Sequence, residues 1–172
     1  MSIYKKLTEF GEQFVPKAKL FKFGFNASPM YRRSTGKVVF AAENLSLIKI
    51  KLRLSWKNKN YVNSMFGGSM FSAVDPIPMI QLIHLLGKDY VVWDKAATIR
   101  FKRPAREHLF ADFTYTQDEL KYIKSCVNEQ NEIEIEKLTE LKNKNGDIVY
   151  CEILKTIYIA DKNFFKNKRK IK

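Results

Sequence analysis

The stretch MFGGSMFSAVD, from Met65 to Asp75, decides the fold of this chain. Two glycines, Gly67 and Gly68, open an apolar run, and a single carboxylate, that of Asp75, interrupts the run two turns later. A ligand can approach a glycine backbone closely because glycine has no Cβ, and the free N–H groups of a helix start suit a carbonyl oxygen or an oxyanion. An acid in an apolar helix is costly unless it is paired or used. The stretch therefore indicates a buried helix that carries functional groups.

The helix predicted from this stretch covers residues 67–86 and is apolar nearly all round, which is typical of burial on most sides. Pro76 and Pro78 lie inside it, so the helix either kinks after Asp75 or restarts there with proline in its first turn. Gly87 is expected to end it.

Strand patterns flank this helix on both sides. In residues 46–56, Ile48, Ile50, Leu52, Leu54 and Trp56 alternate with polar residues, which predicts one buried and one solvated face of an antiparallel sheet. Further strands are predicted at 37–43, 90–103, 108–116, 132–142 and 147–159, the last two forming a hairpin through a type I′ turn at Asn145-Gly146. Helices are predicted at 3–22, broken near Pro16, and at 117–129.

This element order predicts an α+β fold in which antiparallel strands wrap one helix. The division that follows is an N-terminal helical extension over residues 1–28, one domain over 29–161 and a basic tail over 162–172. A length of 172 residues and 45% hydrophobic residues suit a single globular domain with a proper core.

Composition also narrows the location and the chemistry. The chain has no run of about 18 uncharged apolar residues and no apolar block typical of a signal peptide at its start, so neither a membrane span nor a leader is expected. Cys126 and Cys151 are too few for a disulfide framework, and with two histidines they offer no spaced set of metal ligands. We expect reduced thiols, no metal and a cytoplasmic location.

The formal net charge of +13 comes partly from the tail, where six basic residues and no acid follow Asp161. Such a charge suits nucleic acid, an anionic membrane surface or a phosphate-rich ligand such as coenzyme A, and it also fits an ordinary solvated surface. No nucleic-acid-binding module is recognisable, so no nucleic-acid partner is expected.

The chain resembles the hot-dog fold thioesterases, whose motif joins an asparagine, a short gap, His-Gly-Gly and an aspartate nine residues after the histidine. Asn60, Phe66-Gly67-Gly68 and Asp75 fit this spacing, with Phe66 in the place of the histidine. Over residues 30–160 the chain is most similar to the DUF4442 branch of that superfamily. The resemblance implies a long antiparallel sheet around a central helix, a homodimer or a tetramer of two dimers, and an acyl thioester as substrate.

The resemblance also implies catalytic roles for the motif. Asp75 would act as general base or nucleophile, the N–H of Gly67 or Gly68 would stabilise an oxyanion, and Asn60 would position the carbonyl or water. Each residue also has a structural reading. Asp75 can pair with a cation such as Lys95 or cap a helix restarting at Pro76, the glycines can serve tight packing, and Asn60 can hold its loop.

Substrate contacts are expected on two sides of the motif. Coenzyme A enters only as part of the substrate, and no other cofactor is expected. The phenyl ring of Phe66 and neighbouring side chains would wall the acyl chain, and a basic strand end would hold the phosphates of coenzyme A. The predicted substrate-binding residues are Met65, Phe66, Ser69, Trp93, Lys95, Arg100, Lys102 and Arg103.

The spacing within the helix bears on assembly. Gly68 and Asp75 share one face of a regular helix, but they lie about 10 Å apart along its axis at a rise of about 1.5 Å per residue. One thioester carbon cannot touch both, so a working site requires the acid of a second subunit. Two other functions remain open: a non-catalytic acyl- or lipid-binding protein on the same scaffold, and a peripheral-membrane module that uses the N-terminal helix and the basic tail.

Overall fold

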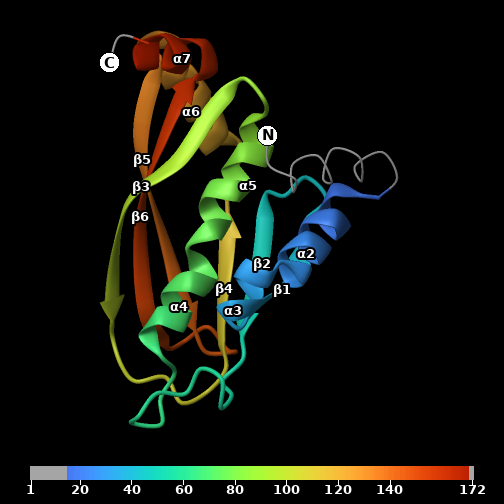
Figure 1. The fold of residues 1–172 in the computed structure, drawn as a ribbon, viewed down its shortest axis with the longest axis vertical. Helices are drawn as coiled ribbons and strands as arrows, with labels where there is room; N and C mark the ends of the chain where they lie inside the picture. Colours follow the sequence, from blue (N-terminus) through green and yellow to red (C-terminus); the bar gives the residue numbers. More distant parts are fainter. Residues whose placement is uncertain (1–14, 171–172) are drawn as a thin grey trace.

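The computed structural model describes residues 15–170, which form a six-stranded antiparallel sheet packed around two consecutive helices (Figure 1). The strands lie in the order β1-β2-β4-β5-β6-β3. This arrangement confirms the predicted α+β, hot-dog architecture. The elements in chain order are α2 (Lys17–Ala27), α3 (Pro29–Arg33), β1 (Gly36–Ala41), β2 (Leu47–Leu52), α4 (Gly67–Val74), α5 (Pro76–Leu86), β3 (Tyr90–Phe101), β4 (Leu109–Thr114), α6 (Gln117–Gln130), β5 (Glu132–Lys142), β6 (Val149–Asp161) and α7 (Lys162–Lys170).

The central helix breaks in two at Asp75, as the prolines predicted. Pro76 stands at the first position of α5, where its missing N–H costs nothing, and Gly87 ends α5 with a φ of 96°. Together α4 and α5 span 20 residues and have the length and apolar composition of a membrane-crossing helix. Their buried side chains, such as Met70, Ala73 and Ile77, nevertheless belong to the main core under the sheet.

Strand β2 confirms the alternating pattern only in part. Ile48, Ile50 and Leu52 are fully buried, but the strand ends at Leu52, and Trp56 is 83% exposed. The prediction that Trp56 faces the core is therefore wrong. The side chain of Asn58 accepts a hydrogen bond from the N–H of Ser55 at 2.9 Å and donates one to the carbonyl oxygen of Arg53 at 3.0 Å. These local bonds replace the strand pairing that the alternation suggested.

The chain before β1 also contributes to the core. Residues 1–14 lie outside the described residues, so the predicted first turns of the N-terminal helix stay untested, and α2 begins directly after Pro16. Phe21 and Phe25 of α2 pack into the main core, and the hydroxyl of the buried Tyr31 donates to the carbonyl oxygen of Ala73 at 3.0 Å. This segment therefore packs directly against the central helix.

The hairpin of β5 and β6 is present, but its turn is not of type I′. That turn requires a positive φ at both central residues. Gly146 has a φ of 82°, whereas Asn145 is not among the residues with a positive φ. Asn143 shapes the turn instead, because its side-chain oxygen accepts hydrogen bonds from the N–H groups of Gly146 and Ile148.

Strand β3 forms one edge of the sheet and pairs only with β6 among the described strands. Its register against β6 shifts between Asp94 and Ala96, where one extra residue makes a bulge. The basic tail is helical where it is described, as α7, and the ring of Phe165 packs edge-on against Trp93 at 5.0 Å.

Helix α6 begins with a complete capping box. The N–H of Glu119 donates to the hydroxyl of Thr116 at 3.1 Å, and the N–H of Thr116 donates to the Glu119 carboxylate at 2.7 Å. We expect Thr116→Ala to lower the free energy of unfolding by about 1 kcal/mol, because the alanine leaves a helix-start N–H without its acceptor. Urea denaturation of both proteins measures the difference, and an unchanged midpoint would contradict this role.

Candidate active site

Three charged side chains meet where the central helix breaks. The ammonium group of Lys155 donates to the carboxylate of Asp75, to the backbone carbonyl oxygen of Asp75 at 3.0 Å, and to Oδ2 of Asp94 at 2.8 Å. Lys155 is only 1% exposed, whereas the side chain of Asp75 is 42% exposed. The cluster therefore consists of a buried cation, a partly buried carboxylate and a carboxylate that reaches solvent.

Each member is placed by the element that carries it. Asp75 stands at the junction of α4 and α5, where its side chain makes no capping hydrogen bond. Asp94 lies at the bulge of β3, and Lys155 lies on the inner face of β6. The helix-cap interpretation of Asp75 is therefore wrong. The paired interpretation is right, with Lys155 in place of Lys95.

Lys155 is the member of this charged cluster that the sequence analysis missed. It lies on the same face of β6 as the fully buried Cys151, Ile153, Ile157 and Ile159, every second residue along the strand. A lysine on the core face of a strand needs a buried anion, because an unpaired buried charge is very costly. This period of two was the available signal. Lys95, the expected partner, instead pairs with Glu134 on the surface.

Asp94 is the more buried of the two carboxylates, with a side chain 23% exposed against 42% for Asp75. Its Oδ1 is buried and has no hydrogen-bond partner among the described residues. Burial raises the pKa of Asp94 above the ordinary value of an aspartate, and the ammonium of Lys155 offsets part of that rise. Asp75 thus has the more accessible carboxylate, held by a cation on one side and open to a reactant on the other.

A pH dependence of stability follows from Asp94. Because its folded-state pKa is raised, the folded protein retains the proton over a range in which the unfolded chain has lost it. The contribution of Asp94 to the free energy of unfolding is therefore largest below about pH 3.9 and falls as the pH rises through the raised pKa. We expect Asp94→Asn to remove this component. The measurement is the difference in urea stability between the two proteins from about pH 3 to pH 7, and parallel profiles would contradict it.

The start of α4 forms the second part of the candidate site. The N–H groups of Ser69 and Met70 donate to the carbonyl oxygen of Phe66. Gly67 and Gly68, the first two helical residues, have no carbonyl one turn earlier in the helix to accept their N–H groups. A Cβ on Gly67 would lie 2.6 Å from the ring of Phe101, and one on Gly68 would overlap the ring of Phe66. The glycines thus allow two aromatic rings to lie directly on the helix start.

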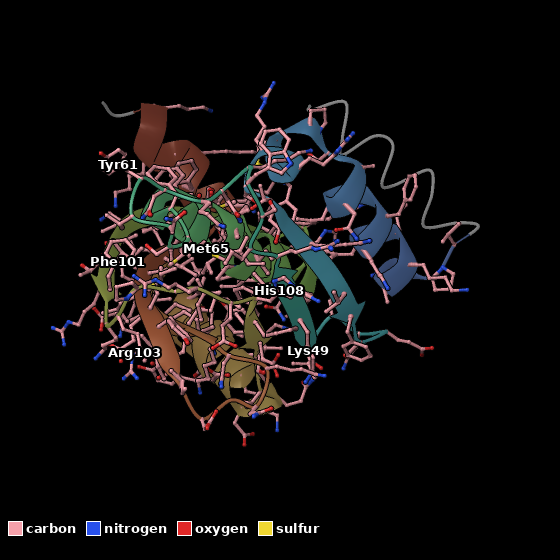
Figure 2. All side chains as sticks on the ribbon, turned by 90° about the horizontal axis from the view of Figure 1, so that it is seen from below. Lys49, Tyr61, Met65, Phe101, Arg103 and His108 are labelled. Carbon is pink, nitrogen blue, oxygen red and sulfur yellow. The ribbon has the colours of Figure 1, made fainter. Side chains whose placement is uncertain are left out.

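A shallow pocket of about 420 Å³ opens beside this helix start. It brings together five of the residues that the sequence singled out, namely Asn60, Met65, Gly67, Lys102 and Arg103. Met65, Phe101 and Arg103 are seen together from below in Figure 2. The remaining lining residues are Ser64, Met70, Phe101 and Pro104. An N–H donor and two cations at one opening suit a polar, anionic part of a ligand.

Two of these residues also have partners within the protein. The side-chain oxygen of Asn60 accepts hydrogen bonds from the N–H groups of Val62 and Ser64, so Asn60 holds its own loop. Lys102 pairs with Glu152 at 2.9 Å. Lys102 is thus already paired within the protein. Of the two cations that line the pocket, Arg103 is therefore the one better placed to bind a phosphate.

The other predicted contacts are dispersed. Ser69 is buried, Phe66 is exposed beside the helix start, and Arg100 is exposed on β3. Trp93 stacks on Tyr158 at a ring-centroid distance of 5.2 Å, toward the end of β3 that faces α7. The 420 Å³ pocket includes Gly67 but not Asp75, which lies eight positions further along the central helix. Within one chain the acid and the helix start therefore lie in two separate places.

Other groups are less suited to the chemistry. Burial raises the pKa of the Cys151 thiol to about 12, so this thiol is no nucleophile near neutral pH. His84 packs against the ring of Phe21 at 5.9 Å beside a mainly apolar pocket of about 380 Å³. That pocket lies between α2 and α5 and also touches Gly24, Leu45 and Ile80.

Comparisons with known proteins place this geometry in a family. The family model DUF4442, described as a domain of unknown function, matches residues 17–159. No curated protein matches the chain. Among solved structures, the chain is similar to the Pseudomonas aeruginosa protein PA5026, described as of unknown function and a probable thioesterase, with a TM-score of 0.72, 16% identity, and coverage of 83% of this chain and 95% of that one.

Two further structures show the same fold at greater distance. The thioesterase HI1161 from Haemophilus influenzae has a TM-score of 0.61 and 10% identity, with 84% of this chain and 90% of that chain covered. A protein of unknown function from Chlorobaculum tepidum has a TM-score of 0.63 and 13% identity, with 92% and 94% covered. At these identities the likeness establishes the fold.

Proposed function

The chain belongs to the DUF4442 family, and on that premise we propose that it hydrolyses an acyl thioester of coenzyme A or of an acyl carrier. The observation that carries the proposal is the Asp75 carboxylate, which Lys155 anchors from the buried side while its other side faces solvent. An anchored, accessible carboxylate is suited to take a proton from water or to attack a carbonyl carbon. Similar structures described as thioesterases support the same reaction class.

In the proposed reaction, Asp75 accepts a proton from water while the water oxygen bonds to the thioester carbon. The carbonyl oxygen becomes an oxyanion, and the N–H of Gly67 or Gly68 donates to it. Collapse of this intermediate breaks the carbon–sulfur bond, and the leaving thiolate takes the proton back. Direct attack by Asp75 would instead give an acyl anhydride that water then hydrolyses.

We propose that each site combines two copies of the chain. Asp75 and the helix start lie too far apart in one chain, and an antiparallel second helix would bring them together. Strand β3 supports this assembly, because it is a 12-residue edge strand with a mostly exposed set of side chains. Such an edge is a template for pairing with another chain. The phosphates of coenzyme A would meet Arg103, with Lys102 and Arg100 nearby.

The first experiment measures free-thiol release from acyl-coenzyme A substrates of increasing chain length. A mixing experiment then tests the shared site. Asp75→Asn and Gly67→Pro subunits, each inactive alone, are refolded together in equal amounts. About half of the dimers are then mixed, each with one intact site, so activity returns to about a quarter of the wild-type value. No recovery in a mixture of confirmed dimers would contradict a site shared between subunits.

The role of the Gly67 N–H can be tested on its own. Gly67 is the first residue of α4, and Phe66 before it has an extended backbone that accepts a following proline. We expect Gly67→Pro, which removes only the N–H donor from the backbone, to lower kcat by about 10²- to 10³-fold. Gly67→Ala is the matched control, because it displaces the same Phe101 ring and keeps the N–H. Equal losses in both variants would assign the effect to the ring.

The second candidate function is acyl binding without hydrolysis. The observation that favours it is the apolar pocket of about 380 Å³ between α2 and α5, which is separate from the Asp75 cluster. Gly24 lines this pocket, and a Cβ added there would meet no atom within 4 Å. If the pocket binds acyl chains, the leucine side chain of Gly24→Leu should occupy it. The variant should then bind a fluorescent fatty acid more weakly than the wild type while its fold stays intact. Fatty-acid binding without thiol release from any substrate would favour this function.

A further inference from the structure

The loop between β2 and α4, residues 53–66, carries a patch of exposed aromatic and basic side chains. Trp56 is 83% exposed and Tyr61 is completely exposed, and Val62 and Phe66 of the same loop are exposed as well. The same loop contains Arg53, Lys57 and Lys59 and no acidic residue. We call this set the loop patch. Exposing large apolar side chains to water does not stabilise a protein. Such a patch on a surface therefore indicates an interaction site.

The loop is built to hold these side chains in place. Asn58 is buried in the loop. Its side-chain amide donates a hydrogen bond to the hydroxyl of Thr35 at 2.7 Å and accepts one from the N–H of Ser55. The N–H of Phe66 donates to the carbonyl oxygen of Asn58 at 2.8 Å, which closes the loop at its base. Asn60 supports the tip of the loop through its contacts with Val62 and Ser64. A preformed loop loses little conformational entropy when it binds.

A second basic segment lies against the loop. The N–H of Met65 donates to the carbonyl oxygen of Ala105 at 2.7 Å, so the chain after β3 runs beside the loop. This segment adds the exposed side chains of Arg103 and Arg106, and the ring of Phe101 is exposed as well. In Figure 1 both segments lie at the lower end of the molecule, and Figure 2 views that end directly, with Tyr61, Phe101 and Arg103 labelled.

We propose that this end of the molecule docks on an anionic lipid membrane. The combination is specific in its chemistry, because tryptophan and tyrosine prefer the interface between lipid headgroups and acyl chains, and lysine and arginine are attracted to anionic headgroups. Lys57 lies over the ring of Trp56 at 5.6 Å, which places a cation beside the aromatic residue that would enter the interface. The proposal does not depend on the proposed hydrolysis.

The basic tail is the less suitable membrane contact. Helix α7 lies at the opposite end of the molecule from the loop (Figure 1). Phe165 packs on Trp93, and Lys168 donates to the carboxylate of Glu132 at 2.7 Å. Phe165 and Lys168 of the tail thus already contact other parts of the protein, whereas the side chains of Tyr61 and Val62 in the loop are exposed to solvent.

The test is sedimentation of the full chain with vesicles of phosphatidylcholine alone or with about one third phosphatidylglycerol, a range in which surface charge drives binding. We expect binding only to the anionic vesicles. Trp56→Ser/Tyr61→Ser and Lys57→Gln/Lys59→Gln should each lower the partition coefficient at least tenfold. The matched controls are Tyr122→Ser and Lys121→Gln/Lys124→Gln on α6, which remove an exposed aromatic ring and two charges elsewhere and should leave binding unchanged.

Three outcomes would overturn the proposal. The first is equal vesicle binding by the loop variants and the α6 controls. The second is loss of vesicle binding in Lys166→Gln/Lys170→Gln, which would assign membrane binding to the tail. The third is a loop variant that changes the oligomeric mass in light scattering and leaves vesicle binding unchanged, because the loop patch would then be an interface with a second copy. A blue shift of Trp56 emission on anionic vesicles, measured in a Trp93→Phe protein, gives an independent reading.

Discussion

Asparagine in place of Asp75 is expected to reduce acyl-thioester hydrolysis at least about a hundredfold, since proton transfer by a positioned carboxylate contributes about 10²- to 10⁴-fold. The amide keeps the size of the carboxylate and an oxygen that can accept from Lys155, but it cannot take a proton from water. Lys155 also keeps its second partner, Asp94. The variant should therefore remain folded. The measurement is thiol release under saturating substrate, with the melting temperature of both proteins recorded.

The matched control is Asp112→Asn, which removes an exposed aspartate paired with Lys49 on the outer side of the sheet. Its activity should equal that of the wild type. If Asp75→Asn also keeps the wild-type kcat, Asp75 is neither base nor nucleophile, and the charged cluster is only structural. If neither protein releases thiol from any acyl chain length, the acyl-binding function becomes the better explanation.

Methionine in place of Lys155 is expected to lower the free energy of unfolding by about 3–5 kcal/mol, the cost typical of removing one partner from a buried ion pair. Methionine fills much of the same space, so the loss comes from the charges. Asp75 and Asp94 would then face one another without the cation that both contact. Urea denaturation near neutral pH measures this difference.

Two comparisons make the Lys155 result specific. Lys95→Met removes a surface cation whose partner, Glu134, is about as exposed as Lys95 itself, and should cost less than about 1 kcal/mol. The Lys155→Met loss should also shrink as the pH falls, because burial raises the pKa of Asp94 and its protonation removes the charge that the missing cation leaves unpaired. A loss no larger than that of Lys95→Met, or one independent of pH, would contradict the description of Lys155 as a buried counter-ion.

The sequence was informative wherever one local rule acted alone. Pro76 and Gly87 predicted the break and the end of the central helix, because a missing N–H and a positive φ act within a few residues. Strand β3 and the hairpin were also predicted. Trp56 was assigned wrongly, since the alternating pattern continues into a loop that the side chain of Asn58 folds back.

The site was only half visible for a different reason. Gly67, Gly68 and Asp75 were singled out because they share one short motif, and Gly67 and Arg103 line the same pocket at the helix start. Lys155 lies 80 residues beyond Asp75, and no local rule connects the two. Only the topology, which places β6 behind the helix break, makes them partners. Pairing over such a separation requires the inner faces of all strands to be known.

The arrangement of the three charges also sets an order for evolutionary change. A homologue can lose Asp75 first at little cost in stability, because Lys155 and Asp94 then remain as a pair of opposite charges. Replacing Lys155 first would leave Asp75 and Asp94 without their shared cation. The resulting loss of stability would be selected against. We therefore expect homologues that lack the acid at the position of Asp75 to keep the lysine at the position of Lys155.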